Sequence, residues 1–268
     1  MSHLRSGGIA ILILVSVFTA GAQVAEAPIE WTLAPYVMFA GMSGTVAIEE
    51  WPAASVNRSS PGPFKGLQAG AGAYFEVRSG AWSFALNASN VSLNQTIEPY
   101  PLVANGDNTL TGTLGTNQTA FDAYLFWRPA KAWEVALGAN GHRIGTIING
   151  TFEEMSGDLV LDEPVNENYP HAWLTVVAGG RWTPVDGERW HVTVFGDIGG
   201  VSGKNWTWQL LPAAGYHVSK MFEVSAQYRL LYVEYINGSA PTPTFTDEGY
   251  LQYRTMTYGP QVAAVFHF

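Results

Sequence analysis

The sequence contains no cysteine, and charged residues make up only 13% of its 268 residues. Without cysteine, neither a disulfide framework nor lipoprotein acylation is available to the chain. The formal net charge of −9 argues against nucleic acid as a partner. Downstream of the first 22 residues, no run approaches the roughly 18 uninterrupted apolar residues expected of a transmembrane helix. The sequence therefore predicts no helical anchor.

The first residues have the pattern of an export signal. Arg5 precedes an apolar stretch from Ile9 to Phe18, and Ala20-Gly21-Ala22 fits a small-x-small cleavage site. The sequence thus predicts a signal peptide over residues 1–22. Nothing resembling a linker or a repeat interrupts residues 23–268, which predicts a single exported domain.

Aromatic residues and strict alternation characterise the end of the chain. Between Tyr258 and Phe268, apolar or aromatic residues occupy every even position. Small or polar residues such as Gly259, Gln261 and His267 lie between them. A strand with this pattern can place one face against lipid and the other in a polar interior.

Similar alternating segments recur along the chain, with turn residues between them. They predict an all-β fold, an antiparallel transmembrane β-barrel of about ten strands, with eight or twelve as alternatives. Residues 45–51 could extend the first hairpin without adding a strand. Short and long connections alternate, as periplasmic turns and external loops do, with a brief external link near residue 203 as the exception. The predicted strands are residues 29–40, 64–78, 81–97, 110–128, 132–149, 171–183, 188–202, 205–217, 221–237 and 250–268.

Side-chain parity assigns the two faces of these strands. Phe121, Leu125 and Trp127 are expected to face lipid. In the predicted strand 221–237, the even-numbered residues are expected to face lipid as well. The opposite positions are polar and predict a polar lumen. In residues 81–97 the outward parity of Trp82, Phe84 and Leu86 is expected to switch to Val91 and Leu93, either through a bulge or at the membrane boundary.

Tryptophans gather at one end of the predicted strands, beside the short turns. An indole buries an apolar body and hydrogen-bonds at its rim, so it concentrates where hydrocarbon meets lipid headgroups. We expect these tryptophans to form a periplasmic girdle. Trp206 and Trp208 are expected to belong to a second girdle at the outer side of the membrane. External recognition by Trp51, Trp206 and Trp208 is the alternative. The inner girdle comprises Trp31, Trp82, Trp127, Trp133, Trp182 and Trp190, with Tyr216, Phe222, Phe266 and Phe268.

Five segments of the chain carry a resemblance to known proteins. They are Trp31-Thr-Leu-Ala-Pro-Tyr36, Phe195-Gly-Asp197-Ile-Gly-Gly200, Gly215-Tyr216, Tyr228-Arg229 and Tyr258-Gly259-Pro260 with the terminal Phe268. These segments resemble a broad family of small, mostly uncharacterised outer-membrane β-barrel proteins of Gram-negative bacteria. The resemblance implies a barrel in the outer membrane with both termini in the periplasm, and it implies no catalytic residue. Lipid, lipopolysaccharide and, during biogenesis, the barrel assembly machinery are the partners expected of such a barrel.

Two groups of inward polar residues are the candidate site. The charged group could form ion pairs that plug a narrow barrel, or a constriction that selects ions or small solutes. A polar wall is expected deeper in the lumen, where a histidine near Asp197 would suggest acid-base chemistry. The ring is Glu76, Arg78, Arg128, Glu134, Arg181 and Glu223, and the wall is Asp122, Tyr124, His142, His191, Asp197 and Arg229, with Asn140, Gln209, Gln227 and Gln261.

Three functions remain open from the sequence: a narrow channel for ions or small solutes, a plugged structural or surface-interaction barrel, and, least favoured, an outer-membrane enzyme. No motif for a catalytic site, a cofactor or a resident metal occurs, so the sequence predicts a non-enzymatic protein without cofactors. Residues 151–170 hold six acidic residues and no lysine or arginine. They predict a solvated acidic loop, with binding of a divalent cation as the alternative.

Overall fold

The computed structural model describes residues 28–48, 51–57, 68–101, 108–156, 159–238 and 250–268. Side chains are described for residues 28–47, 68–92, 115–145, 170–238 and 250–268. The predicted signal peptide, residues 1–22, lies outside these ranges. In the described part of the chain, no helix is long and apolar enough to cross a membrane.

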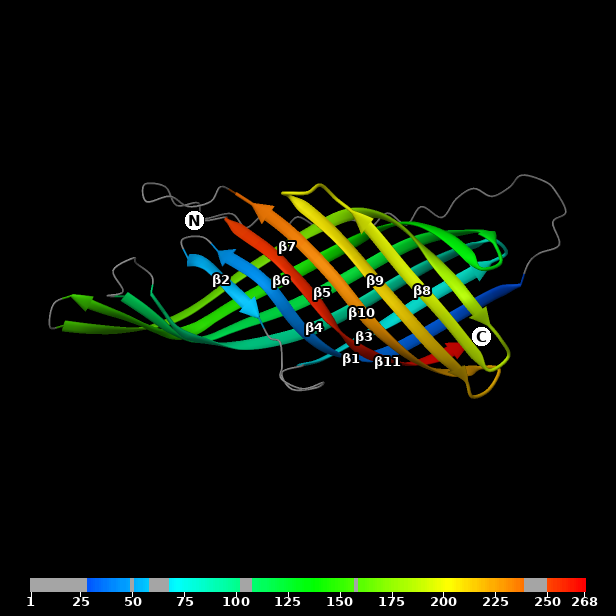
Figure 1. Ribbon diagram of the computed structural model, residues 1–268, viewed down its shortest axis with the longest axis horizontal. Coiled ribbons are helices and arrows are strands. Elements are labelled where there is room, and N and C mark those ends of the chain that lie inside the picture. The colour runs from blue at the N-terminus through cyan, green and yellow to red at the C-terminus, as the bar shows by residue number, and fades with distance from the viewer. Residues whose placement is uncertain (1–27, 49–50, 58–67, 102–107, 157–158, 239–249) are drawn as a thin grey trace, which may run out of the picture.

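The described chain forms a closed antiparallel barrel (Figure 1). Ten strands make the wall, because β1 pairs with both β3 and β11, whereas β2 pairs only with the far part of β1. The expected ten-stranded fold is confirmed, and the first hairpin is extended without an added barrel strand. The strands are β1 (Ile29–Ile48), β2 (Trp51–Asn57), β3 (Gln68–Ser79), β4 (Trp82–Pro101), β5 (Asn108–Ala130), β6 (Trp133–Ser156), β7 (Leu159–Asp186), β8 (Trp190–Gly199), β9 (Asn205–His217), β10 (Phe222–Asn237) and β11 (Leu251–His267).

Both ends of the barrel chain lie at the same rim. The backbone N–H of Trp31 donates to the carbonyl of Phe268 at 3.1 Å, and that of Phe268 donates back at 3.0 Å. The short connections at 80–81, 131–132, 187–189 and 218–221 lie at this rim, which we call the turn end. The opposite rim, the loop end, carries the tight link between β8 and β9, where Gly200 and Gly203 have φ angles of +84° and +80°.

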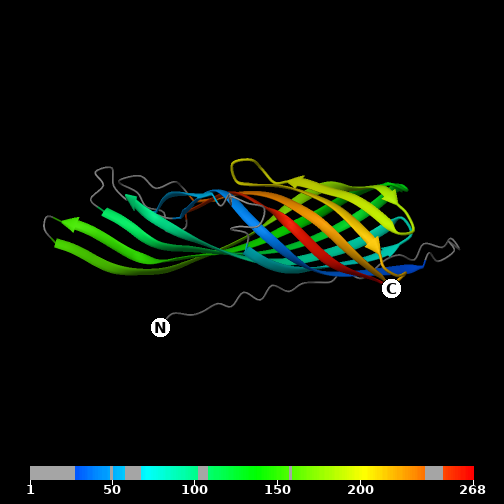
Figure 2. The ribbon, with the colours of Figure 1, turned by 60° about the horizontal axis from the view of Figure 1, so that its bottom comes forward.

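Strand length differs greatly around the wall. A tilted transmembrane strand needs about 9–11 residues, yet β6 has 24 and β7 has 28. These two strands pair without a break as far as Ser156 opposite Leu159, and they extend well past the rest of the barrel at the loop end (Figures 1 and 2). The predicted loop over residues 151–170 is therefore wrong. The pairing of β6 with β7 keeps one register from the turn end to the tip of the hairpin. The acidic residues in this segment therefore do not interrupt the strands. The side chains of 151–169 lie outside the described ones, as does the suggested cation site.

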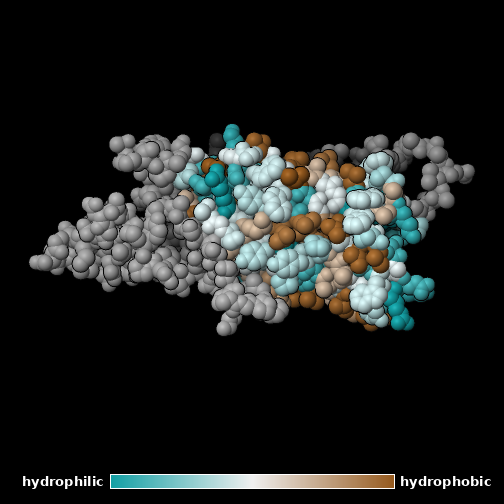
Figure 3. Space-filling view, in the orientation of Figure 1, coloured by the Kyte–Doolittle hydropathy of each residue, from teal (hydrophilic) through white to brown (hydrophobic). Residues whose placement is uncertain are grey.

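The outside of the barrel wall exposes many large apolar side chains. Exposed side chains include Leu137, Leu174 and Val176, each more than 60% accessible. Figure 3 shows apolar patches over the face in view and hydrophilic residues at the turn end. A continuous apolar surface around a closed barrel has no stable partner in water, whereas lipid matches it. The molecule is a transmembrane β-barrel.

The expected tryptophan girdle is confirmed at the turn end. The indoles lie outward in cross-strand pairs, with Trp82 against Trp127 at 6.4 Å between ring centroids and Trp133 stacked on Trp182 at 5.6 Å. Trp190 meets Tyr216 edge-on at 5.0 Å. Side chains directly opposite on one face of a sheet stabilise its register, so the girdle also fixes neighbouring strands.

Alternation of buried and exposed positions follows the predicted parity in β5, β10 and β11. The expected switch in β4 is wrong. Val91 is 3% exposed and points inward, in phase with Ser83, Ala85 and Ser89. Val91 instead belongs to an apolar part of the interior, so an apolar residue in the inward phase needs no bulge. The side chain of Leu93 lies outside the described ones.

Two inward tyrosines each cover a glycine directly across the sheet. Tyr36 is opposite Gly72, and Tyr124 is opposite Gly138. A Cβ on Gly72 would lie 2.4 Å from the Tyr36 ring, and one on Gly138 would lie 2.4 Å from the Tyr124 ring and from the Ala123 carbonyl. Both glycines therefore make the space that the aromatic rings occupy in the narrow interior.

Replacing Gly138 with alanine is expected to destabilise the barrel by about 1–3 kcal/mol, because the new methyl group overlaps the Tyr124 ring and the backbone. Urea unfolding in detergent micelles, followed by tryptophan fluorescence, measures this change. Gly141→Ala in the same strand is the control, since its Cβ would meet no atom closer than 3.4 Å. Equal stability of the two variants would contradict the packing role of Gly138.

Candidate functional site

Charged side chains converge on the inward face near the turn end. Alternation places Glu76 and Arg78 on the same face of β3, and the register sets Glu134 of β6 directly opposite Arg181 of β7. Arg128 reaches the group from the end of β5. Because these residues lie at similar distances from the rim, strand closure brings together positions that are more than 100 residues apart in sequence.

Three arginines share two carboxylates in this cluster. Arg181 lies 2.8 Å from the Glu76 carboxylate and also contacts that of Glu134, while its guanidinium lies 4.5 Å over the Phe126 ring. Arg78 contacts Glu76 at 2.7 Å and Glu134 at 2.6 Å, and Arg128 contacts Glu134 at 3.0 Å. A carboxylate removed from water is stabilised only by such paired donors. We call these five residues the charge cluster.

A polar layer lies farther from the turn end. Tyr124 Oη donates to Asp197 Oδ2 at 2.5 Å, and Gln209 Nε2 donates to the same oxygen at 2.7 Å. Arg229 lies 3.6 Å from Asp122 and donates to Gln209 Oε1 at 3.3 Å. The layer connects β5, β8, β9 and β10 across the lumen, so it braces the barrel as well as filling it.

The remaining predicted residues occupy other places. Glu223 was expected beside the arginines, but its ion pairs are with His191, His217 and His267. His191 accordingly lies near the turn end and not in the polar layer, because β8 begins at Trp190. Parity fixed the face of each residue correctly, but it could not fix which neighbours meet across the lumen.

His142 also lies apart from Asp197. Its ring centroid is 5.5 Å from that of Trp173, and neither ring nitrogen has a hydrogen-bond partner among the described residues. Asp197 is hydrogen-bonded by Tyr124 and Gln209. Neither candidate histidine hydrogen-bonds to Asp197 within the described part of the chain, so the acid-base pair suggested by the sequence does not form.

An apolar layer lies in the interior toward the loop end, with buried polar residues such as Gln118 and Thr257 between its members, and it corrects the expectation of a polar lumen. Trp173 and Tyr235 stack at 4.1 Å between centroids and pack against it. The sequence signal was present as apolar residues in the inward phase of β1, β10 and β11. The layer consists of Met38, Ala40, Met42, Val46, Val91, Ile144, Leu231, Val233, Leu251 and Tyr253.

A cavity of about 400 Å³ occupies the half of the lumen nearer the turn end. Its wall includes the charge cluster, the polar residues Asp122, Gln209 and Arg229, and the histidines around Glu223. None of the ten residues of the apolar layer lines it. The cavity therefore ends on the turn-end side of the apolar layer.

No protein-family model and no curated protein sequence matches the chain. Some solved structures resemble it. The outer membrane protease OmpT from Escherichia coli is 10% identical, with a TM-score of 0.49 over 91% of this chain and 99% of that chain. Ail, the attachment invasion locus protein of Yersinia pestis, is 8% identical, with a TM-score of 0.39 over 90% and 99%. A deltaS2S3 mutant of the TodX monoaromatic hydrocarbon channel is 8% identical, with a TM-score of 0.38 over 91% of each chain. These similarities assign neither a family nor an activity.

Arg181→Leu is expected to lower the free energy of unfolding by about 3–5 kcal/mol, because it removes one of the two arginines that contact both buried carboxylates and leaves Arg78 as the other. Arg128→Leu is the matched control. Its side chain is 38% exposed and, among the described residues, forms an ion pair with Glu134 only, so we expect a loss of about 1 kcal/mol or less. Urea unfolding of both variants tests the difference, and a similar loss in both would show that the shared contacts of Arg181 carry no special weight.

Proposed function

We propose that this protein is an integral outer-membrane barrel whose lumen is closed to ions at rest, and that it acts as a structural or surface-interaction protein. The observation that carries the proposal is the apolar layer, which lies in the interior between the cavity and the loop end. A hydrated ion would have to shed its water to pass side chains such as Leu231 and Tyr253, which are 3% and 0% exposed. Nothing in an apolar constriction replaces that water.

The proposed orientation places the turn end, with both chain ends, in the periplasm and the extended hairpins outside the cell. Short turns on one side and long connections on the other support it, since bacterial barrels have this asymmetry. In this orientation the apolar belt contacts membrane lipid, and the loop end contacts lipopolysaccharide. The barrel assembly machinery would act on the chain during insertion.

A narrow channel is the second candidate, and the cavity of about 400 Å³ favours it. This space is lined by charged and polar side chains and reaches inward as far as Tyr36 and Gln261. Passage through the barrel would then require the apolar layer to move aside. Enzymatic activity is not part of the proposal, because the arrangement that suggested it, a histidine on Asp197, does not form.

In planar bilayers, we expect the refolded wild-type protein to show no stable conductance steps. The double variant Leu231→Ala/Tyr253→Ala removes bulk from the apolar layer and is expected to produce steps. Leu210→Ala is the matched control, because Leu210 faces outward and is 38% exposed. Folding of each protein is verified first by its altered gel mobility before and after heating.

Stable steps from the folded wild-type protein would overturn the closed lumen and favour the channel. The triple variant Arg78→Ala/Arg128→Ala/Arg181→Ala then becomes decisive for the charge cluster. A change in step size or in ion preference would identify the cluster as the selective constriction.

A further inference from the structure

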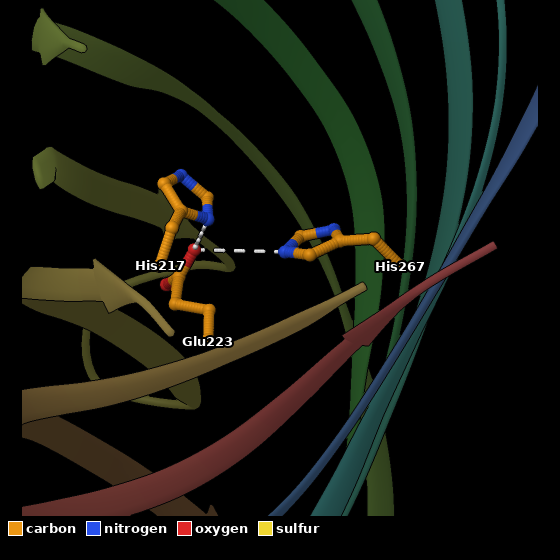
Figure 4. A group of neighbouring side chains, drawn as sticks. All are labelled: His217, Glu223 and His267. Carbon is orange, nitrogen blue, oxygen red and sulfur yellow. Dashed lines mark ion pairs between the residues drawn. The ribbon is translucent and has the colours of Figure 1, made fainter. Parts of the chain in front are cut away.

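One carboxylate at the turn end is surrounded by histidines from neighbouring strands. Glu223, the second residue of β10, lies directly opposite His217 of β9, while His191 comes from β8 and His267 from the end of β11. Figure 4 shows His217 and His267 approaching the same carboxylate oxygen of Glu223 from different strands. All four side chains line the cavity. We call them the histidine cluster.

The spacing of the donor atoms matches a metal coordination shell. Glu223 Oε2 lies 3.3 Å from His217 Nδ1 and 3.5 Å from His267 Nε2, and Oε1 lies 3.4 Å from His191 Nδ1. Donor atoms of Glu223, His217 and His267 all lie within 4.8 Å of one another. A tetrahedral site with metal–ligand distances of about 2.0–2.1 Å separates neighbouring donors by about 3.3–3.4 Å. The distances from Glu223 to the histidine donors have about this edge length, and the donors of His217 and His267 lie within 4.8 Å of each other.

Two histidine nitrogens of the cluster approach Glu223 without forming a hydrogen bond to it. His191 Nδ1 and His267 Nε2 are buried and have no hydrogen-bond partner among the described residues. Buried polar atoms without hydrogen-bond partners are costly. A cation held between the carboxylate and the imidazole nitrogens removes this cost.

The surroundings of the cluster are shaped for this carboxylate. Gly215 lies beside it, and a Cβ there would be 1.9 Å from Glu223 Oε1. The other ring nitrogen of His267, Nδ1, lies 3.4 Å from Thr32 Oγ1 of β1. Metal-binding histidines commonly have such a polar neighbour on the second nitrogen, which fixes ring orientation.

We propose that the histidine cluster binds one divalent transition-metal ion, with Zn²⁺ as the ion that its donors suit best. Imidazole nitrogens and a carboxylate oxygen are ordinary ligands of this ion. Glu223, His217 and His267 form the core of the site, and His191 is the residue within reach of a fourth position. The bound ion cross-links β9, β10 and β11 next to the seam with β1. This proposal is independent of whether the lumen conducts.

The test uses the mature protein without a histidine tag, refolded in detergent micelles and stripped with a chelator. Calorimetric titration with Zn²⁺ is expected to show one ion per barrel, and the bound ion is expected to raise the thermal unfolding temperature. His217→Gln, His267→Gln and Glu223→Gln should each weaken binding at least tenfold. His171→Gln, which removes a histidine of β7 outside the cluster, should leave binding unchanged.

Absence of stoichiometric Zn²⁺ binding by the folded wild-type protein would overturn the proposal. Equal affinity in wild type and in the double variant His217→Gln/His267→Gln would overturn it as well. The glutamine variants preserve size and polarity, so heat-dependent gel mobility can verify that each barrel is folded before titration. If Glu223→Gln does not fold, the two single histidine variants decide the question.

Discussion

The pairing of β1 with β11 is the contact on which the rest of the structure depends. Lipid offers no hydrogen-bond partner to a backbone N–H or C=O group, so a membrane sheet must leave no free edge. The register between Thr32 and His267 at one rim and between Ile48 and Leu251 at the other removes both edges. A barrel of ten strands is only slightly wider than one that side chains fill completely. Closure therefore determines that inward side chains meet across the lumen.

The interior becomes less polar along the barrel axis. At the turn end, where water is near, five charged side chains share contacts, and deeper inside Arg229 meets Asp122 among neutral donors and acceptors. Toward the loop end apolar side chains predominate, and the buried polar residues between them, such as Gln118, Thr255 and Thr257, carry no charge. Burying a charge is costly unless other charges compensate it. The grouping of carboxylates around shared arginines, and their absence from the apolar layer, both follow from this cost.

The sequence predicted much of the fold because its period-2 pattern carries the required information. The alternating pattern assigned each outward residue of β10, and each tryptophan beside a short turn, to one face of the barrel without ambiguity. The contents of the lumen were harder to predict, since parity gives the face of a side chain but not its partner across the barrel. Glu223 and Arg78 share a face, yet one meets histidines and the other carboxylates. Hairpin length was also missed, because the pairing of β6 with β7 depends on register and not on composition.

The histidine cluster lies on the side of the wall that contains β8, the shortest of its described strands. β8 and β9 have 10 and 13 residues, against 24 and 28 in β6 and β7. Local opening is easiest where few cross-strand hydrogen bonds must break. Contacts from Glu223 to β8, β9 and β11 join this side of the barrel at its rim, close to the β1–β11 seam. A side-chain cross-link there offsets the shortness of the strands, whereas the same contacts between β6 and β7 would add little to a hairpin already paired along its whole length.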